Sequence, residues 1–195
     1  MKTAIILGAT GLTGGVLLQK LLADKKYKKI KLFSRNPVGY KHPKIVEYLV
    51  DMLQLELHRE DFIADQVFCC IGTTKSKTPD KEKYKAIDFG IPVAAADLCE
   101  QNNIHCFMVM SALGANPNST IFYSKVKGEM EKEVLKREIR STYLFQPSLI
   151  SGERNEKRAG EGIAKKVMKV IDPLLVGPWE KYRSISPEEI ADAMI

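Results

Sequence analysis

The stretch GATGLTGG, Gly8–Gly15, constrains the fold of this chain more than any other part of its sequence. It follows the apolar run TAIIL, a short candidate strand, and precedes a leucine-rich pattern with helical spacing. Glycines at a strand end often serve only a turn. Here we expect Gly8 to permit the tight turn, Gly11 to let backbone N–H groups approach a pyrophosphate, and Gly14 to let the helix pack closely. The loop therefore predicts dinucleotide binding, with the helix N-terminus directed at the phosphates.

Short apolar runs alternate with longer amphipathic segments along most of the chain. We expect strands at 3–7, 30–34, 45–50, 66–71, 104–110 and 142–146, and helices near 12–24, 52–60, 81–102 and 121–139. This alternation predicts an α/β fold of the Rossmann type, a doubly wound parallel sheet with helices on both faces. Residues 1–195 are expected to form a single domain, in which 147–195 make a small substrate-side region.

Within that region the pattern changes to loops and short helices. A short amphipathic helix is predicted at 163–175, and a loop at 176–185 contains the single tryptophan, Trp179. This loop is either a substrate lid or a surface for a protein partner, although a lone tryptophan is more often packed in a core. Ser186 is predicted to cap a last helix that begins at Pro187.

The composition argues against several other classes of protein. With 45% hydrophobic and 28% charged residues the chain is globular, and no apolar run reaches the ~20 residues of a membrane span. The first apolar run stops at Gly8 without a small-residue cleavage site, so we predict a strand there and a cytoplasmic protein. The four cysteines include no C-x-x-C pair and the three histidines are scattered, which predicts reduced thiols and no metal site.

The basic charge does not by itself indicate nucleic-acid binding. The net charge is +6, but the lysines alternate with acids and lack an interleaved pattern of aromatic residues. We therefore expect a solvated face, part of which attracts an anionic cofactor. Neither nucleic acid nor a membrane is expected as a partner.

The end of the second strand bears on which nicotinamide cofactor is used. Sites specific for NAD usually place an acid here for the ribose 2′-hydroxyl, but this strand ends in Ser34 and Arg35. A guanidinium group can pair with two oxygens of a 2′-phosphate, whereas the alternative is a surface arginine that stacks on adenine. The sequence favours NADP, with NAD possible.

The next two strand ends supply further candidate cofactor contacts. Asp51 follows the third strand and is a candidate for adenine binding together with the backbone of Met52. The alternative role for Asp51 is to cap the following helix. Gly72 and Thr73 follow the fourth strand, where they could lie along a ribose.

A tyrosine, a lysine and a serine form a candidate catalytic set. Tyr123 and Lys127 are four residues apart and so share one face of a helix. The same spacing occurs at Tyr27–Lys31 and Tyr40–Lys44, but only Tyr123–Lys127 opens a helix after the fifth strand, which ends near Ser111. A nearby ammonium favours the phenolate form of tyrosine, and serine can hold a substrate oxygen. The alternative is a solvated helix N-terminus.

Five motifs together resemble the short-chain dehydrogenase/reductase superfamily: GATGLTG, SRN, MSALGA, YSKVKGEME and LFQPSLISGER. The resemblance spans nearly the whole chain and is strongest to small atypical members of the Tat-interacting protein group, whose relatives include epimerase-like proteins. It implies a catalytic triad of Ser111, Tyr123 and Lys127. One departure is Asp88, where many extended members have asparagine. The implied cofactor contacts are Thr10, Gly11, Leu12 and Thr13 at the phosphates, Arg35 at a 2′-phosphate, and Pro147, Ser148, Leu149 and Ile150 beside the nicotinamide.

Two functions of different classes follow from these features. The first is an NADP(H)-dependent oxidoreductase that acts on a small carbonyl or alcohol substrate through the serine, tyrosine and lysine. The second is a regulatory protein that senses NADP(H) and binds a protein partner with little or no turnover. A nucleoside-diphosphate-sugar epimerase-like enzyme is a further alternative, for which the region after Gln146 is short. The protein is expected to be a monomer or a homodimer.

Overall fold

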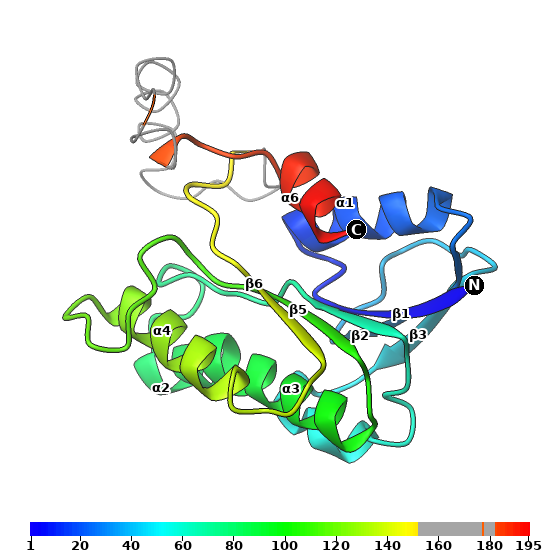
Figure 1. Ribbon diagram of the computed structural model, residues 1–195, viewed down its shortest axis with the longest axis horizontal. Helices are drawn as coiled ribbons and strands as arrows, with labels where there is room; N and C mark the ends of the chain where they lie inside the picture. Colours follow the sequence, from blue (N-terminus) through cyan, green and yellow to red (C-terminus); the bar gives the residue numbers. More distant parts are fainter. Residues whose placement is uncertain (152–176, 178–181) are drawn as a thin grey trace.

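Six parallel strands form the centre of the protein (Figure 1). The computed structural model describes residues 1–151, 177 and 182–195. The strand order is β3-β2-β1-β4-β5-β6, so the chain starts in the middle of the sheet, moves outward to β3 and returns to the other side of β1. This is the doubly wound order that the sequence predicts. The strands are β1 (Lys2–Leu7), β2 (Tyr27–Ser34), β3 (Ile45–Leu49), β4 (Gln66–Cys69), β5 (Cys106–Met110) and β6 (Ser141–Phe145).

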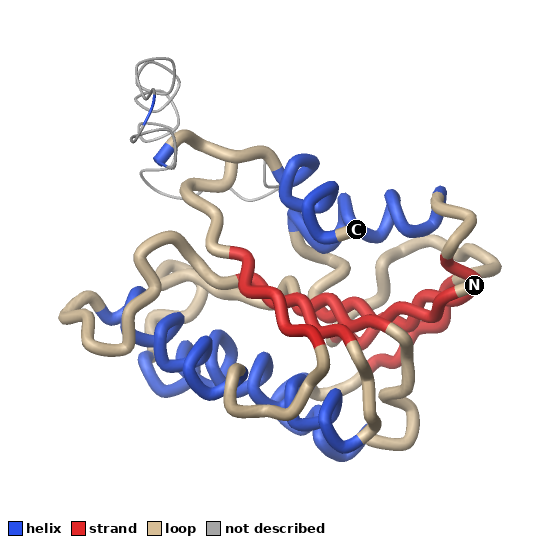
Figure 2. Tube along the Cα trace, viewed as in Figure 1, coloured by secondary structure: helices blue, strands red, loops and turns tan. Residues whose placement is uncertain are grey.

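Helices cover both faces of the sheet, with α1 and α6 on one face and α2, α3 and α4 on the other (Figures 1 and 2). Side chains of β1 alternate between the two apolar cores: Ile5 and Leu7 join the core beneath α3 and α4, and Ala4 and Ile6 the core beneath α1. The helical elements are α1 (Leu12–Ala23), η1 (Met52–His58), α2 (Lys81–Lys85), η2 (Ala86–Gly90), α3 (Ile91–Gln101), α4 (Phe122–Val134) and α6 (Pro187–Met194).

The prediction of a single helix over 81–102 is wrong in one respect, because a π-helical turn, η2, separates α2 from α3. Pro92 is the second residue of α3 and has no N–H to donate to the carbonyl of Asp88, four residues earlier. The helix widens there and starts again at Ile91. The expected helix over 52–60 is the short 3₁₀ element η1, which is kinked at Gln54.

The last helix, α6, packs against α1, and Lys20 pairs with Asp192 across them at 2.6 Å. As predicted, Ser186 caps α6, in a reciprocal arrangement with Glu189.

The helix expected at 163–175 and Trp179 lie outside the described residues. Of the helices that the structure describes, none is both long and apolar enough to cross a membrane.

Tyr27, at the start of β2, makes the stability of the fold depend on pH in the alkaline range. The residue is 2% exposed, its hydroxyl donates to Gln66 Oε1 at 2.8 Å, and burial raises its pKa to about 12. An unfolded chain releases this proton near pH 10. The stabilisation from this group is therefore fully present below about pH 10 and is lost as the pH rises through about 12.

We expect Tyr27→Phe to lower the free energy of unfolding at neutral pH and to make it fall less steeply with pH between those two values. Urea unfolding on either side of this window measures the change in slope. Tyr143→Phe, at an exposed tyrosine of β6, is the matched control. Equal slopes in the wild type and Tyr27→Phe would contradict the expectation.

Candidate functional site

A cavity of about 1220 Å³ opens at the carboxyl edge of the sheet. Its walls come from the β1–α1 loop, the segments after β4, β5 and β6, and the start of α4. It lies where the strand order reverses on either side of β1 and β4, which is where ligands bind in doubly wound sheets. The predicted site residues that line it are Thr10, Gly11, Leu12, Thr13, Gly72, Thr73, Ser111, Tyr123, Lys127, Pro147, Ser148, Leu149 and Ile150.

The glycines of the β1–α1 loop shape this cavity. Gly8 has a φ of +88°, and a Cβ on Gly14 would lie 2.2 Å from the carbonyl oxygen of Gly8, so only glycine fits at either position. Gly11 is the N-cap residue of α1, and no side chain caps this helix. The first-turn N–H groups of α1 are therefore available to an anion at the cavity wall, and a dinucleotide pyrophosphate fits this place.

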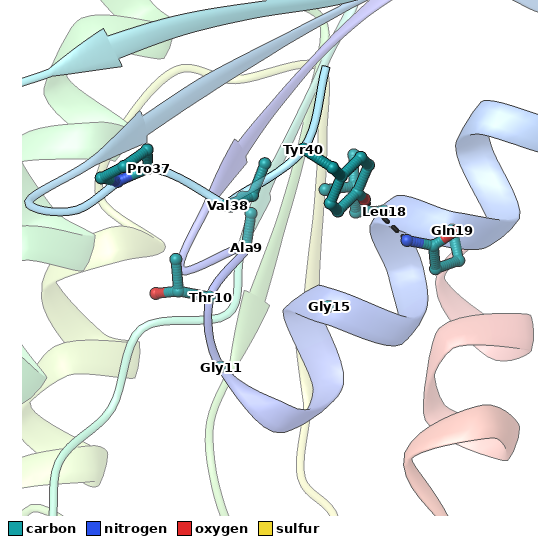
Figure 3. Close-up of a pocket in the computed structure, with 9 residues that line it drawn as sticks. All are labelled: Ala9, Thr10, Gly11, Gly15, Leu18, Gln19, Pro37, Val38 and Tyr40. Carbon is teal, nitrogen blue, oxygen red and sulfur yellow. Dashed lines mark hydrogen bonds between the residues drawn. The ribbon is translucent and has the colours of Figure 1, made fainter. Parts of the chain in front are cut away.

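A second cavity, of about 350 Å³, lies between the same loop and the segment after β2 (Figure 3). Thr10 and Gly11 line both cavities, so the two adjoin at the β1–α1 loop. The hydroxyl of Tyr40 accepts a hydrogen bond of 2.6 Å from Gln19 Nε2 at the wall of the smaller cavity (Figure 3). The β1–α1 loop thus has an open space on each side.

The four residues predicted on the adenine side line neither cavity. Ser34 is buried and donates to a backbone carbonyl two residues on, whereas Arg35 is exposed where β2 ends. Asp51 caps η1 by accepting from a backbone N–H at 2.9 Å, which is the alternative role considered for it. The side chain of Met52 is part of the apolar core.

Lys127 is held inside the cavity wall by a buried ion pair. Its Nζ lies 3.1 Å from Oδ1 of Asp88 and donates to the carbonyl of Met110 at 3.2 Å. Oδ2 of Asp88 accepts from the backbone N–H of Thr73 at 2.7 Å, which ties the segment after β4 to the π-helical turn. Burial raises the pKa of Asp88, while the ammonium of Lys127 and the N–H of Thr73 oppose that rise.

Ser111 has a partner that the sequence analysis missed. Its hydroxyl donates to Oε1 of Glu131, and Gln146 Nε2 donates to the same oxygen at 2.8 Å. A serine hydroxyl has one proton, so in this arrangement Ser111 offers only lone pairs to the cavity. A sequence signal for Glu131 exists, because it follows Tyr123 and Lys127 at the same four-residue spacing along α4.

The three candidate catalytic residues reach the cavity with different degrees of exposure. Tyr123 is 43% exposed at the start of α4, whereas Ser111 and Lys127 are 5% and 3% exposed. The tyrosine therefore faces the part of the cavity open to solvent, and the other two form its inner wall. This arrangement leaves the tyrosine open to solvent in the same cavity as a buried lysine that is paired with Asp88.

Comparisons with known proteins bear on the family and the fold of this chain. Residues 8–172 match the model of a family described as NAD(P)H-binding. Protein HTATIP2 of Rattus norvegicus is 30% identical over 85% of this chain and 69% of its own length. The mitochondrial protein FMP52 of Debaryomyces hansenii is 29% identical over 99% of this chain and 86% of its own. Among solved structures, the enzyme WbmH of Bordetella bronchiseptica in complex with NAD⁺ has a TM-score of 0.74 at 14% identity and shares the fold, covering 99% of this chain and 70% of WbmH.

Proposed function

Because the chain belongs to the NAD(P)H-binding family and is related to HTATIP2, we propose that it is an oxidoreductase of the short-chain dehydrogenase/reductase type that uses NADP(H). Its substrate is a small carbonyl compound or the corresponding alcohol. The observation that supports the proposal most is that Ser111, Tyr123 and Lys127 line the same cavity as the glycine loop. Thr10–Thr13 would hold the cofactor phosphates, and Pro147–Ile150 would lie beside the nicotinamide.

When bound, the cofactor supplies a hydride to the substrate carbon. Tyr123 gives its phenolic proton to the substrate oxygen during reduction and takes it back during oxidation. Lys127, which is paired with Asp88 inside the wall, stabilises the phenolate with its ammonium. Ser111 accepts a hydrogen bond from the hydroxyl of the alcohol, since its own proton is directed to Glu131. Donation from Ser111 to a carbonyl oxygen requires the serine to turn away from Glu131.

The proposed preference for NADP(H) depends on Arg35. It is exposed at the carboxyl end of β2, beside the segment that lines the smaller cavity. We expect Arg35→Ala to weaken NADPH binding by about 10- to 100-fold, the effect of losing hydrogen bonds to a charged group, and to leave NADH binding unchanged. Isothermal titration calorimetry with both cofactors measures this.

The matched control for Arg35 is Arg140→Ala. Arg140 is also exposed, but it precedes β6 and therefore lies at the opposite edge of the parallel sheet. An equal loss of NADPH affinity in the two variants would show that general charge, rather than a phosphate contact of Arg35, attracts the cofactor. Failure of the wild type to bind either nucleotide would contradict the proposed function as a whole.

A regulatory NADP(H)-binding protein is the second candidate. The direction of the Ser111 proton, toward Glu131 rather than into the cavity, favours it. NADPH binding without turnover of any aldehyde or ketone, together with capture of a protein partner that requires NADPH, would support this candidate.

The cytoplasmic location remains a prediction, and the name of the FMP52 relative places that protein in mitochondria.

A further inference from the structure

We infer that the substrate of this site is an anion, a carbonyl or alcohol compound with a carboxylate or phosphate group held by lysines of the β4–α2 segment. The inference rests on the proposed function and specifies its substrate class. Among the described lining residues of the main cavity, four are lysines and one is an acid. That acid, Asp88, is paired with Lys127, which leaves Lys75 and Lys81 as positive charges on the β4–α2 wall.

No carboxylate of the described residues pairs with Lys75 or Lys81, in contrast to several lysines on other elements. Lys20, Lys85 and Lys136 each pair with a carboxylate, at 2.6, 2.8 and 2.6 Å respectively. The two acids next to Lys81 in the sequence, Asp80 and Glu82, do not line the cavity, and Asp80 uses its carboxylate to cap α2. A low-dielectric cleft lined by charges of one sign attracts ligands of the other sign.

Lys81 lies on the wall beside the candidate catalytic tyrosine. Its Nζ lies 5.7 Å from the ring centroid of Phe122, the residue that precedes Tyr123. The Phe122 ring in turn packs edge-on against Tyr84, with centroids 5.4 Å apart. Because a cation over an aromatic face is held in place, the ammonium of Lys81 has a defined position at the mouth of the cavity. A substrate that binds Lys81 through an anionic group would therefore reach Tyr123 with its other end.

Several hydrogen bonds stabilise the turn that contains Lys75. The hydroxyls of Thr73 and Thr78 are 2.8 Å apart, and those of Thr74 and Ser76 are 3.0 Å apart. The backbone N–H of Thr78 donates to the carbonyl of Thr74 at 2.8 Å. Together with the bond from Thr73 to Asp88, these contacts order the segment before any ligand binds, which reduces the entropy lost on binding.

The test uses a matched pair of aldehydes, 4-carboxybenzaldehyde and the neutral 4-methylbenzaldehyde, with NADPH. We expect wild-type kcat/KM to be higher for the carboxylate by about tenfold, through KM, and to fall toward the neutral value in the double variant Lys75→Gln/Lys81→Gln. Added salt should reduce the preference in the wild type. Lys83→Gln, on the same helix but outside the cavity lining, is the control and should retain it.

A second measurement separates this inference from the proposed chemistry. Calorimetry of terephthalate, an unreactive dicarboxylate, with the NADP⁺-loaded protein should show binding that is about tenfold weaker in the double variant. If neither aldehyde is reduced but terephthalate binds in this way, the anion site stands and the oxidoreductase proposal fails. Equal kcat/KM for the two aldehydes in the wild type would overturn the inference. If the double variant loses affinity for NADPH instead of terephthalate, the two lysines bind the cofactor, and this result would also overturn the inference.

Discussion

Tyr123→Phe is expected to lower turnover by about 10²- to 10⁴-fold, the usual contribution of a positioned general acid–base group, while cofactor affinity stays at the wild-type value. Tyr123 is the exposed member of the proposed triad, at 43%, and it lines the same cavity as Lys127. Removal of one oxygen leaves the ring and the backbone of α4 in place. NADPH oxidation with 4-carboxybenzaldehyde measures turnover, and calorimetry measures cofactor binding.

The control for this variant is Tyr143→Phe, which removes a hydroxyl from an exposed tyrosine of β6 outside the cavity lining. It should leave both quantities unchanged. A Tyr123→Phe protein that reduces the aldehyde at the wild-type rate would end the proposed role of the phenol. The regulatory candidate would gain support from a wild type that binds NADPH and reduces no carbonyl compound at all.

Asp88→Ala is expected to reduce the free energy of unfolding by about 3–5 kcal/mol, because it leaves the ammonium of Lys127 buried without its carboxylate. The two side chains are 1% and 4% exposed and 3.1 Å apart. The substitution also removes the acceptor for the backbone N–H of Thr73, so the segment after β4 loses its bond to η2. Urea unfolding measures the stability, and NADPH calorimetry measures the effect on the cavity.

Two further variants separate charge from packing at this pair. Asp88→Asn keeps one acceptor oxygen but not the negative charge, so it should be intermediate in stability. The double variant Asp88→Leu/Lys127→Met removes both charges and should recover most of the lost stability, since apolar side chains of similar volume often replace a buried pair well. It should not recover turnover, because Lys127 is gone. Wild-type stability in Asp88→Ala would contradict the importance of this pair.

Several features of the site were predictable because they depend on local patterns. The φ of +88° at Gly8 and the close contact between Gly14 and Gly8 are the geometry that the glycine spacing indicates. The cap at Ser186 follows from the residues next to it. The π-helical turn was missed, although Pro92 is a visible local cause, because helical periodicity on both sides hid a turn with one extra residue.

The doubly wound fold, the position of the glycine-rich β1–α1 loop and the four-residue spacing of Tyr123 and Lys127 can be read from the sequence alone. These follow from hydrophobic periodicity and from backbone conformations that only glycine allows, which act between neighbouring residues. The ion pair of Asp88 with Lys127 and the hydrogen bond that Ser111 donates to Glu131 become apparent only once the chain is folded. Each pair joins residues from different elements of the chain. A buried charge or hydroxyl needs a polar partner, and tertiary packing determines which polar group lies close enough to be that partner.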